Sequence, residues 1–171
     1  IHWITHPETK KITHQWRSEE AAIVIGTNTA INDNPNLTVR AASGTNPARI
    51  ILDEDDKLPK NLSLFDGASR TIILSKKKLK SSKNYEVWNL NFDNFISEFN
   101  HALFTNEILS VIVEGGGQLL NSFLKQGVWD EARVLTGNTQ FGAGLLAPKI
   151  SSQPTSLEKF NDDQISYYIN D

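Results

Sequence analysis

The chain has 171 residues, 39% of them hydrophobic and 22% charged, and a formal net charge of −3. These values predict one globular domain with one core, and exclude general attraction to nucleic acid or anionic membrane; no apolar run approaches the ~20 residues that span a bilayer. The absence of cysteine excludes disulfides and thiolate sites, and agrees with a cytoplasmic protein.

The first elements predicted along the chain are a helix and a strand. Pro7 lies in the expected first turn of the helix, and apolar residues at helical spacing predict about three turns that end near Arg17. Residues 21–25 are all apolar and are followed by Gly26, which indicates a buried strand that stops abruptly.

A polar segment, residues 26–40, follows this strand without a spacer. It therefore lies at the carboxyl edge of the predicted sheet, where open α/β sheets bind ligands. Its short polar side chains predict a long loop, and Pro35 favours an extended conformation at Asn34. By chemistry alone, a loop closed by Asx turns and a binding site are equally good interpretations.

The middle of the chain predicts three strands and a helix. Apolar runs indicate buried strands at 49–53 and 71–75, an alternating pattern indicates an edge strand at 85–88, and 92–104 is an amphipathic helix. The acidic run 53–56 is interpreted as a solvated turn. The lysines that follow residue 75 are interpreted as a solvated loop, with proximity to a dinucleotide 2′-phosphate as the weaker alternative.

Residues 109–114 predict a central strand, which a glycine turn at 115–117 separates from a helix at 118–125. Such a turn exposes backbone N–H groups and a helix N-terminus to a diphosphate, although any tight strand-to-helix turn also favours glycine. Glu114 ends an apolar strand, so its carboxylate requires a partner. That partner is either a ligand or the amides of a neighbouring loop.

The last third predicts strands at 130–137 and 164–169, with a glycine-rich loop at 141–145 that is able to close over a ligand. The four histidines form no convincing ligand set, so no metal is expected. Alternating strands and helices predict an α/β fold of three layers.

Two motifs resemble one known family. The first is G-x-x-T-x-x-x-D-N-P-x-L-T-x-R, from Gly26 to Arg40, and the second is V-E-G-G-x-x-L-x-x-x-L from Val113. Both are similar to the reductase domain of the bifunctional deaminase/reductase of riboflavin biosynthesis, and Trp3-Ile4-Thr5 resembles a further segment of that domain. The resemblance implies a dihydrofolate-reductase-like, mostly parallel mixed sheet.

The resemblance also implies an activity and a set of site residues. The activity would be the reduction of 5-amino-6-(5-phosphoribosylamino)uracil by NADPH. The residues facing the cofactor would be Trp3, Thr29, Asp33, Gly116, Gly117, Gln118, Leu119, Leu120, Asn121 and Ser122. The residues facing the substrate would be Arg17, Leu37, Arg40 and Glu114, and Glu114 would be catalytic. Two guanidinium groups suit a phosphorylated substrate, whereas surface ion pairing is the alternative role for both.

Three departures from the family pattern qualify these expectations. Ile1 replaces a serine, and Glu54 replaces a small hydroxyl residue after the strand at 49–53, so Glu54 is left out of the site. The family begins with a further strand, upstream of which lies a zinc deaminase domain. Residues 1–171 would then be an N-terminally truncated domain, which is either inactive or completed by the native protein.

Two other functions remain open. A stand-alone reductase of a related diaminopyrimidinone or a pterin would share the cofactor loop. A non-catalytic nucleotide-binding or assembly domain would turn nothing over. The expected partners are a small phosphoribosyl-pyrimidine and a second copy in a homodimer or higher homo-oligomer, with neither nucleic acid nor membrane; NADPH and NADH are not distinguished.

Overall fold

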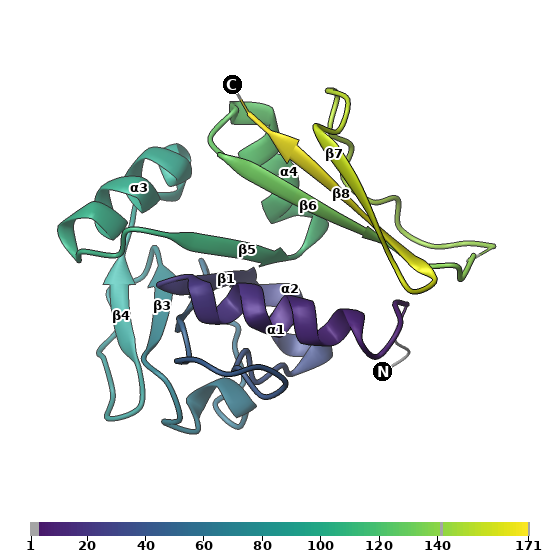
Figure 1. The fold of residues 1–171 in the computed structure, drawn as a ribbon. Helices are drawn as coiled ribbons and strands as arrows, with labels where there is room; N and C mark the ends of the chain where they lie inside the picture. The colour runs from purple at the N-terminus through teal and green to yellow at the C-terminus, as the bar shows by residue number, and fades with distance from the viewer. Residues whose placement is uncertain (1–3, 141, 171) are drawn as a thin grey trace.

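The strands of the protein form two sheets. A computed structural model describes residues 4–140 and 142–170. Five parallel strands have the order β4-β3-β2-β1-β5, and three antiparallel strands have the order β6-β8-β7 (Figure 1). The helices are α1 (Thr9–Glu19), α2 (Thr27–Asp33), α3 (Phe95–Thr105) and α4 (Gly117–Gln126), with single 3₁₀ turns at Ser63–Phe65 and Phe92–Asn94. The strands are β1 (Ala22–Gly26), β2 (Ala48–Leu52), β3 (Thr71–Ser75), β4 (Glu86–Asn89), β5 (Val111–Gly115), β6 (Glu131–Thr136), β7 (Ser156–Phe160) and β8 (Asp163–Ile169).

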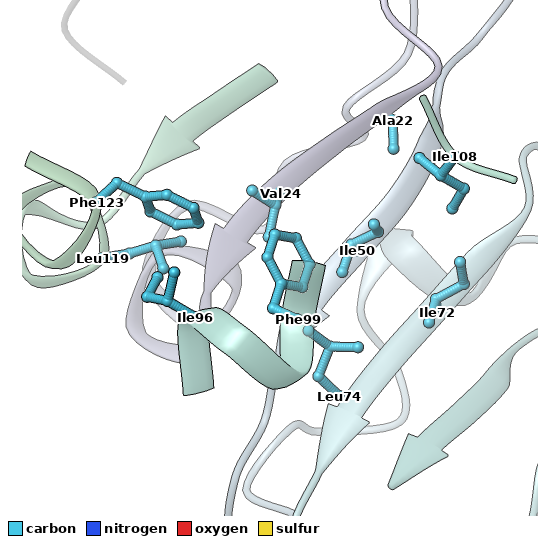
Figure 2. Close-up of a cluster of buried hydrophobic side chains, with 10 residues drawn as sticks. All are labelled: Ala22, Val24, Ile50, Ile72, Leu74, Ile96, Phe99, Ile108, Leu119 and Phe123. Atoms are coloured by element: carbon cyan, nitrogen blue, oxygen red, sulfur yellow. The ribbon is translucent and has the colours of Figure 1, made fainter. Parts of the chain in front are cut away.

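One face of the parallel sheet is covered by α3 and α4. Because successive residues of a strand point to opposite faces, alternate residues of β1, β2 and β3 form one layer of core. Figure 2 shows this layer against Ile96 and Phe99 of α3 and Leu119 and Phe123 of α4. The rings of Phe99 and Phe123 meet edge to face with centroids 6.0 Å apart. This packing fixes the start of α4 against the sheet.

The opposite face is covered by α2 and by the segment that leads to β3. The other alternate residues of the strands, among them Ile25 and Ile51, pack there against Ala30 of α2 and against Leu37 and Leu64. Both faces of the parallel sheet are therefore buried, as its apolar strands require. The predicted three-layer α/β fold is confirmed.

Most predicted elements have the expected bounds. The helix at α1, the strands β1 to β4, the aromatic helix α3 and the strands β6 and β8 are all present, and β4 is an edge strand as predicted. The apolar runs explain this agreement, because a buried strand needs two apolar faces. The prediction that Pro7 lies in the first turn of the first helix is wrong, because Pro7 lies in the turn that precedes α1, whose first residue is Thr9. In residues 4–140 and 142–170, no helix is both long and apolar enough to cross a membrane.

The prediction of a long loop at 26–40 is wrong for residues 27–33, which form α2. The prediction of an extended Asn34 is also wrong: Asn34 ends α2 in the left-handed conformation, with φ 41° and ψ 54°. Asparagine tolerates the left-handed conformation better than most residues. Asn34 therefore ends the helix in this conformation, although Pro35 favours an extended conformation at the residue before it.

The prediction that 109–114 is a central strand is correct in type and wrong in position. β5 lies at an edge of the five-stranded sheet, with β1 on one side only. The antiparallel strands, predicted as part of the same sheet, form a separate one, and the sequence did not predict β7. Four of the five β7 residues are exposed, so this strand carries no apolar pattern.

Candidate functional site

Two strand-to-helix turns lie together at the carboxyl edge of the parallel sheet. β1 leads directly into α2, β5 leads through Gly116 into α4, and Ile25 of β1 is paired with Gly115 of β5. Thr29 of α2 packs against the second turn. A Cβ atom on Gly115 would lie 3.0 Å from Thr29 Cγ2, and one on Gly116 would lie 3.4 Å from Thr29 Oγ1. The predicted cofactor residues Thr29 and Gly116 are therefore neighbours.

The glycine turn leaves the N-terminus of α4 open. Gly116 precedes the helix with φ 87°, a conformation that favours glycine. The first hydrogen bond within this helix is donated by Leu120 N to Gly116 O, 3.1 Å away. The backbone N–H groups of Gly117, Gln118 and Leu119 come before this bond and point out of the helix end.

The other predicted cofactor residues of α4 differ in exposure. The side chain of Leu119 is buried in the core at 6% exposure, whereas Leu120, Asn121 and Ser122 are partly buried. Ser122 donates its hydroxyl to Gln118 O at 3.0 Å, within the helix. In this segment the backbone of the first turn is thus accessible, whereas the side chain of 119 is buried in the core and the hydroxyl of 122 is bonded within the helix.

Helix α2 explains the spacing of Thr29 and Asp33. The two residues are four apart in a helix, so they share one face. Asp33 is exposed at the last position of α2, one turn beyond the half-buried Thr29. In a loop, residues four apart need not lie close together, whereas in a helix Thr29 and Asp33 necessarily lie on one face.

Arg17 of α1 and Glu114 of β5 form a bidentate ion pair. Arg17 Nε donates to Glu114 Oε1 at 2.6 Å, and Nη2 donates to Oε2 at 2.5 Å. The side chains are 15% and 22% exposed, so the pair is partly buried. Two residues predicted to face the substrate thus lie in contact, and Glu114 immediately precedes the Gly115–Gly116 turn. The partner that the Glu114 carboxylate requires is a guanidinium, not the amides of a loop.

The segment of Leu37 and Arg40 lies against α1. Leu37 is 3% exposed and packs in the core with φ 52°, so its side chain anchors the segment. Arg40 is exposed, and its backbone N–H donates to His14 Nδ1 at 3.1 Å. Burial, followed by the nearby charges of Arg17, Arg40 and Lys10, lowers the pKa of His14 to about 4, against an opposing hydrogen bond with the Thr38 backbone.

Some predicted groups are placed elsewhere or lie outside the description. Trp3 lies outside the described residues. Glu54, left out of the site, pairs with Lys76 at 3.1 Å at the carboxyl ends of β2 and β3. Asp53, interpreted as part of a solvated turn, is instead buried and accepts hydrogen bonds from the backbone N–H groups of Lys57 and Leu58.

The two surface depressions lie away from Glu114 and Gly116, and no metal-binding cluster is found among the described residues. One depression is lined by residues of β6, β7 and β8 and of the adjacent loops, and another by Glu54, Lys76 and residues 89–93; neither includes Glu114 or Gly116. Within 4–140 and 142–170, no three His, Cys, Asp or Glu side chains gather in a way that could hold a metal ion.

Sequence reasoning missed the contribution of His14. The residue lies three positions before Arg17, so helical spacing alone places the two on neighbouring parts of one face. Its burial and its hydrogen bond to Arg40 N depend on tertiary structure, which the sequence does not display. Asp163 was missed for the same reason: it accepts hydrogen bonds from His6 N at 2.7 Å and Thr9 Oγ1 at 2.5 Å.

Known proteins resemble this chain over most of its length. Residues 1–171 match the family model described as the RibD C-terminal domain. The riboflavin biosynthesis protein RibD of Aquifex aeolicus is 36% identical over 154 residues, which cover 84% of this chain and 42% of the relative. A 2,5-diamino-6-ribosylamino-4(3H)-pyrimidinone 5′-phosphate reductase of Archaeoglobus fulgidus is 25% identical over 179 residues, which cover 95% of this chain and 81% of the relative.

A solved structure agrees with these matches. The deaminase/5-amino-6-(5-phosphoribosylamino)uracil reductase of Thermotoga maritima has a TM-score of 0.84 and 26% identity, over 98% of this chain and 50% of that one. The chain thus spans about half the length of the RibD proteins that it matches. The predicted family and its dihydrofolate-reductase-like fold are confirmed: this chain belongs to the RibD C-terminal domain family.

Proposed function

We propose that this chain reduces 5-amino-6-(5-phosphoribosylamino)uracil to the ribitylamino form with NADPH, a step of riboflavin biosynthesis. The observation that carries the proposal is the Arg17–Glu114 pair directly before the Gly115–Gly116 turn. Polar groups suited to a substrate and a turn suited to a dinucleotide are joined there by one peptide bond. The relatives named above as reductases support the same assignment.

The residues at the glycine turn fit a dinucleotide. The backbone N–H groups of 117–119 and the positive end of the α4 dipole would hold its diphosphate. The missing side chain at Gly116 leaves room for close approach, since a Cβ there would already touch Thr29. When bound, NADPH supplies a hydride from C4 of its nicotinamide.

The residues on the substrate side would bind and orient. The Glu114 carboxylate would accept hydrogen bonds from amino groups of the pyrimidine or from ribityl hydroxyls, while Arg17 holds that carboxylate in place. The exposed guanidinium of Arg40 would bind the phosphate with a bidentate pair of hydrogen bonds. Such positioning lowers the barrier to hydride transfer by fixing the reacting carbon beside the donor.

A second substrate has one observation in its favour. The Archaeoglobus relative is named for a diaminopyrimidinone, and this chain covers 81% of its length. That substrate also carries a phosphate, so Arg40 would serve either compound. The two compounds differ in the substituents of the pyrimidine ring. The protein groups that accept hydrogen bonds from its amino substituents, such as the Glu114 carboxylate, would discriminate between them.

The test measures the rate of NADPH oxidation from the change in absorbance, with each phosphorylated substrate and with a pterin. It is run on this chain and on a form extended upstream, after calorimetry has measured binding of NADPH and NADH to both. Turnover of the phosphoribosylaminouracil supports the proposal. Faster turnover of the diaminopyrimidinone or the pterin would replace the substrate, and no dinucleotide binding by either form would leave a non-catalytic domain.

A further inference from the structure

His14 occupies an unusual position for a residue outside the expected site. It lies in α1, one turn before Arg17, and is 1% exposed. Its Nδ1 accepts a hydrogen bond from the backbone N–H of Arg40, which is 26 residues away in the sequence. An imidazole nitrogen accepts only when it carries no proton, so the ring is neutral, with its proton on Nε2.

The segment that His14 holds has little regular structure of its own. Residues 34–40 form neither helix nor strand, and both Asn34 and Leu37 have positive φ values, of 41° and 52°. Side chains satisfy two successive N–H groups there: Val39 N donates to Asn46 Oδ1 at 2.8 Å, and Arg40 N donates to His14 Nδ1. The direction in which Arg40 leaves the backbone therefore depends on these two acceptors.

The charges around His14 agree with a neutral ring. Arg17 and Lys10 of α1 and Arg40 of the facing segment all disfavour its protonated form. The same arrangement places His14 close to both arginines of the proposed substrate side. A cation at His14 would repel the arginines and lose the Nδ1 acceptor, so the geometry requires the neutral ring in order to hold Arg40.

We propose that His14 is a positioning residue for the substrate phosphate. By fixing the Arg40 backbone through Nδ1, it holds Arg40 against α1, the helix that also carries Arg17. This proposal rests on the proposed function, because it takes Arg40 as the group that binds the phosphate. It assigns His14 no contact with the substrate and no proton transfer.

Steady-state kinetics of three variants test the proposal. The readouts are KM and kcat for the phosphorylated substrate and for the same compound without its phosphate. His14→Leu removes the acceptor, His14→Asn restores one because an asparagine Oδ1 occupies nearly the place of Nδ1, and Arg40→Ala removes the guanidinium. Gln15→Ala, an exposed position of the same helix, is the matched control.

We expect His14→Leu to raise KM for the phosphorylated substrate by about tenfold, as the loss of one buried hydrogen bond would. The value of kcat should stay within about twofold, and the compound without phosphate should be unaffected. Arg40→Ala should act in the same direction, and His14→Asn should regain most of the loss. An equal rise in KM for both compounds, a fall in kcat alone, or no recovery in His14→Asn would overturn the proposal.

Two measurements do not depend on turnover. The ¹⁵N shifts of the His14 ring report its tautomer, and a protonated Nδ1 near neutral pH would overturn the proposal. Titration with ribose 5-phosphate, followed at the backbone amide of residue 40, should give weaker binding than in wild type in Arg40→Ala and in His14→Leu or, if His14→Leu does not fold, in His14→Ala. Wild-type binding in His14→Leu or His14→Ala, whether or not Arg40→Ala binds more weakly, would overturn it, whereas turnover absent from every form would overturn the proposed reaction alone.

Discussion

At the scale of single residues, the Arg17–Glu114 pair is the most specific arrangement. Its two members are 97 residues apart in the sequence and meet through two charge-assisted hydrogen bonds. A partly buried pair of this kind loses more when one partner is removed than it contributes when intact, because the remaining charge is left without its partner. When either residue is substituted, the free energy of unfolding should therefore be measured together with the activity.

We expect Glu114→Gln to lower turnover by at least about tenfold and to leave the Kd of NADPH within about twofold. The amide retains the shape but loses the charge, and its NH₂ group faces a guanidinium that can only donate. Cofactor contacts would come from the backbone of α4, which the substitution does not alter. Kinetics and calorimetry measure the two quantities; retained turnover would rule out an essential charge at Glu114.

The buried His14 should make stability depend on pH. An unfolded histidine titrates near 6.5, whereas burial and the nearby cations lower the folded pKa of His14 to about 4. As the pH falls from about 6.5 to about 4, the unfolded chain binds a proton that the folded chain does not, so stability is lost. Between about pH 7 and about pH 5, this loss is on the order of 2 kcal/mol.

Urea unfolding of wild type and His14→Asn at both pH values measures this contribution. Carboxylates titrate in part of the same range, so the informative quantity is the difference between the two proteins. Wild type should lose more stability than the variant on acidification. Parallel losses would show that the His14 pKa is not lowered in the folded protein.

At the scale of elements, Gly116 controls the start of α4. We expect Gly116→Ala to raise the Kd of NADPH by about tenfold or more, because alanine at φ 87° is strained and its Cβ would lie 3.4 Å from Thr29 Oγ1. Gly127→Ala is a matched control at the other end of α4, with φ 64° and no atom within 4 Å of a Cβ. It should lose stability and retain NADPH affinity, measured by calorimetry; equal affinity losses would contradict a specific role for Gly116.

The strands were predictable for a simple physical reason. Runs such as 22–25 and 72–74 place apolar side chains on both faces of a short strand, and such a strand needs a sheet that is covered on both sides. The order of strands in the sheet is not encoded in any local pattern. This is why β5, with three apolar residues in a row, was expected at the centre and lies at an edge.

Helix α2 shows the converse limit. Its sequence TNTAIND has only two apolar residues, and the local preference of Asn and Asp, without tertiary contacts, is for turns. The buried contact of Ala30 with the sheet overrides these local preferences. The resemblance implied a site role for Thr29, Arg17 and Glu114, which stays a prediction, without showing that one helix places Thr29 beside the glycine turn or that Arg17 binds Glu114.

At the scale of the whole molecule, α1 joins the two sheets. Arg17 binds Glu114 of β5, Trp16 lies 4.7 Å from the Arg133 guanidinium of β6, and Thr9 donates to Asp163 of β8. In the part of the chain that is described, no ladder pairs β5 with β6. Side chains of α1 thus carry much of the connection that backbone pairing provides within each sheet.

The two sheets should therefore open with different free energies. Both apolar core clusters are built on the parallel sheet, whereas Ile165 is the one buried hydrophobic residue of the described part of β6, β7 and β8. Regions with few buried apolar contacts open at lower free energy than the core. We expect amide hydrogen exchange in β6 and β8 to be faster than in β1, β2 and β3.

Asp163→Ala tests whether α1 carries the coupling. This substitution leaves His6 N and Thr9 Oγ1 without their common acceptor, at a cost of about 1–3 kcal/mol. Exchange in β6 and β8 should then accelerate by about tenfold while the β1–β3 amides stay unchanged, because an opening that releases the smaller sheet leaves the two core clusters intact. Asp162→Ala, an exposed neighbour, is the control. Equal acceleration in both sheets would show instead that the molecule opens as one cooperative unit, and that α1 is part of that unit and not a separable link.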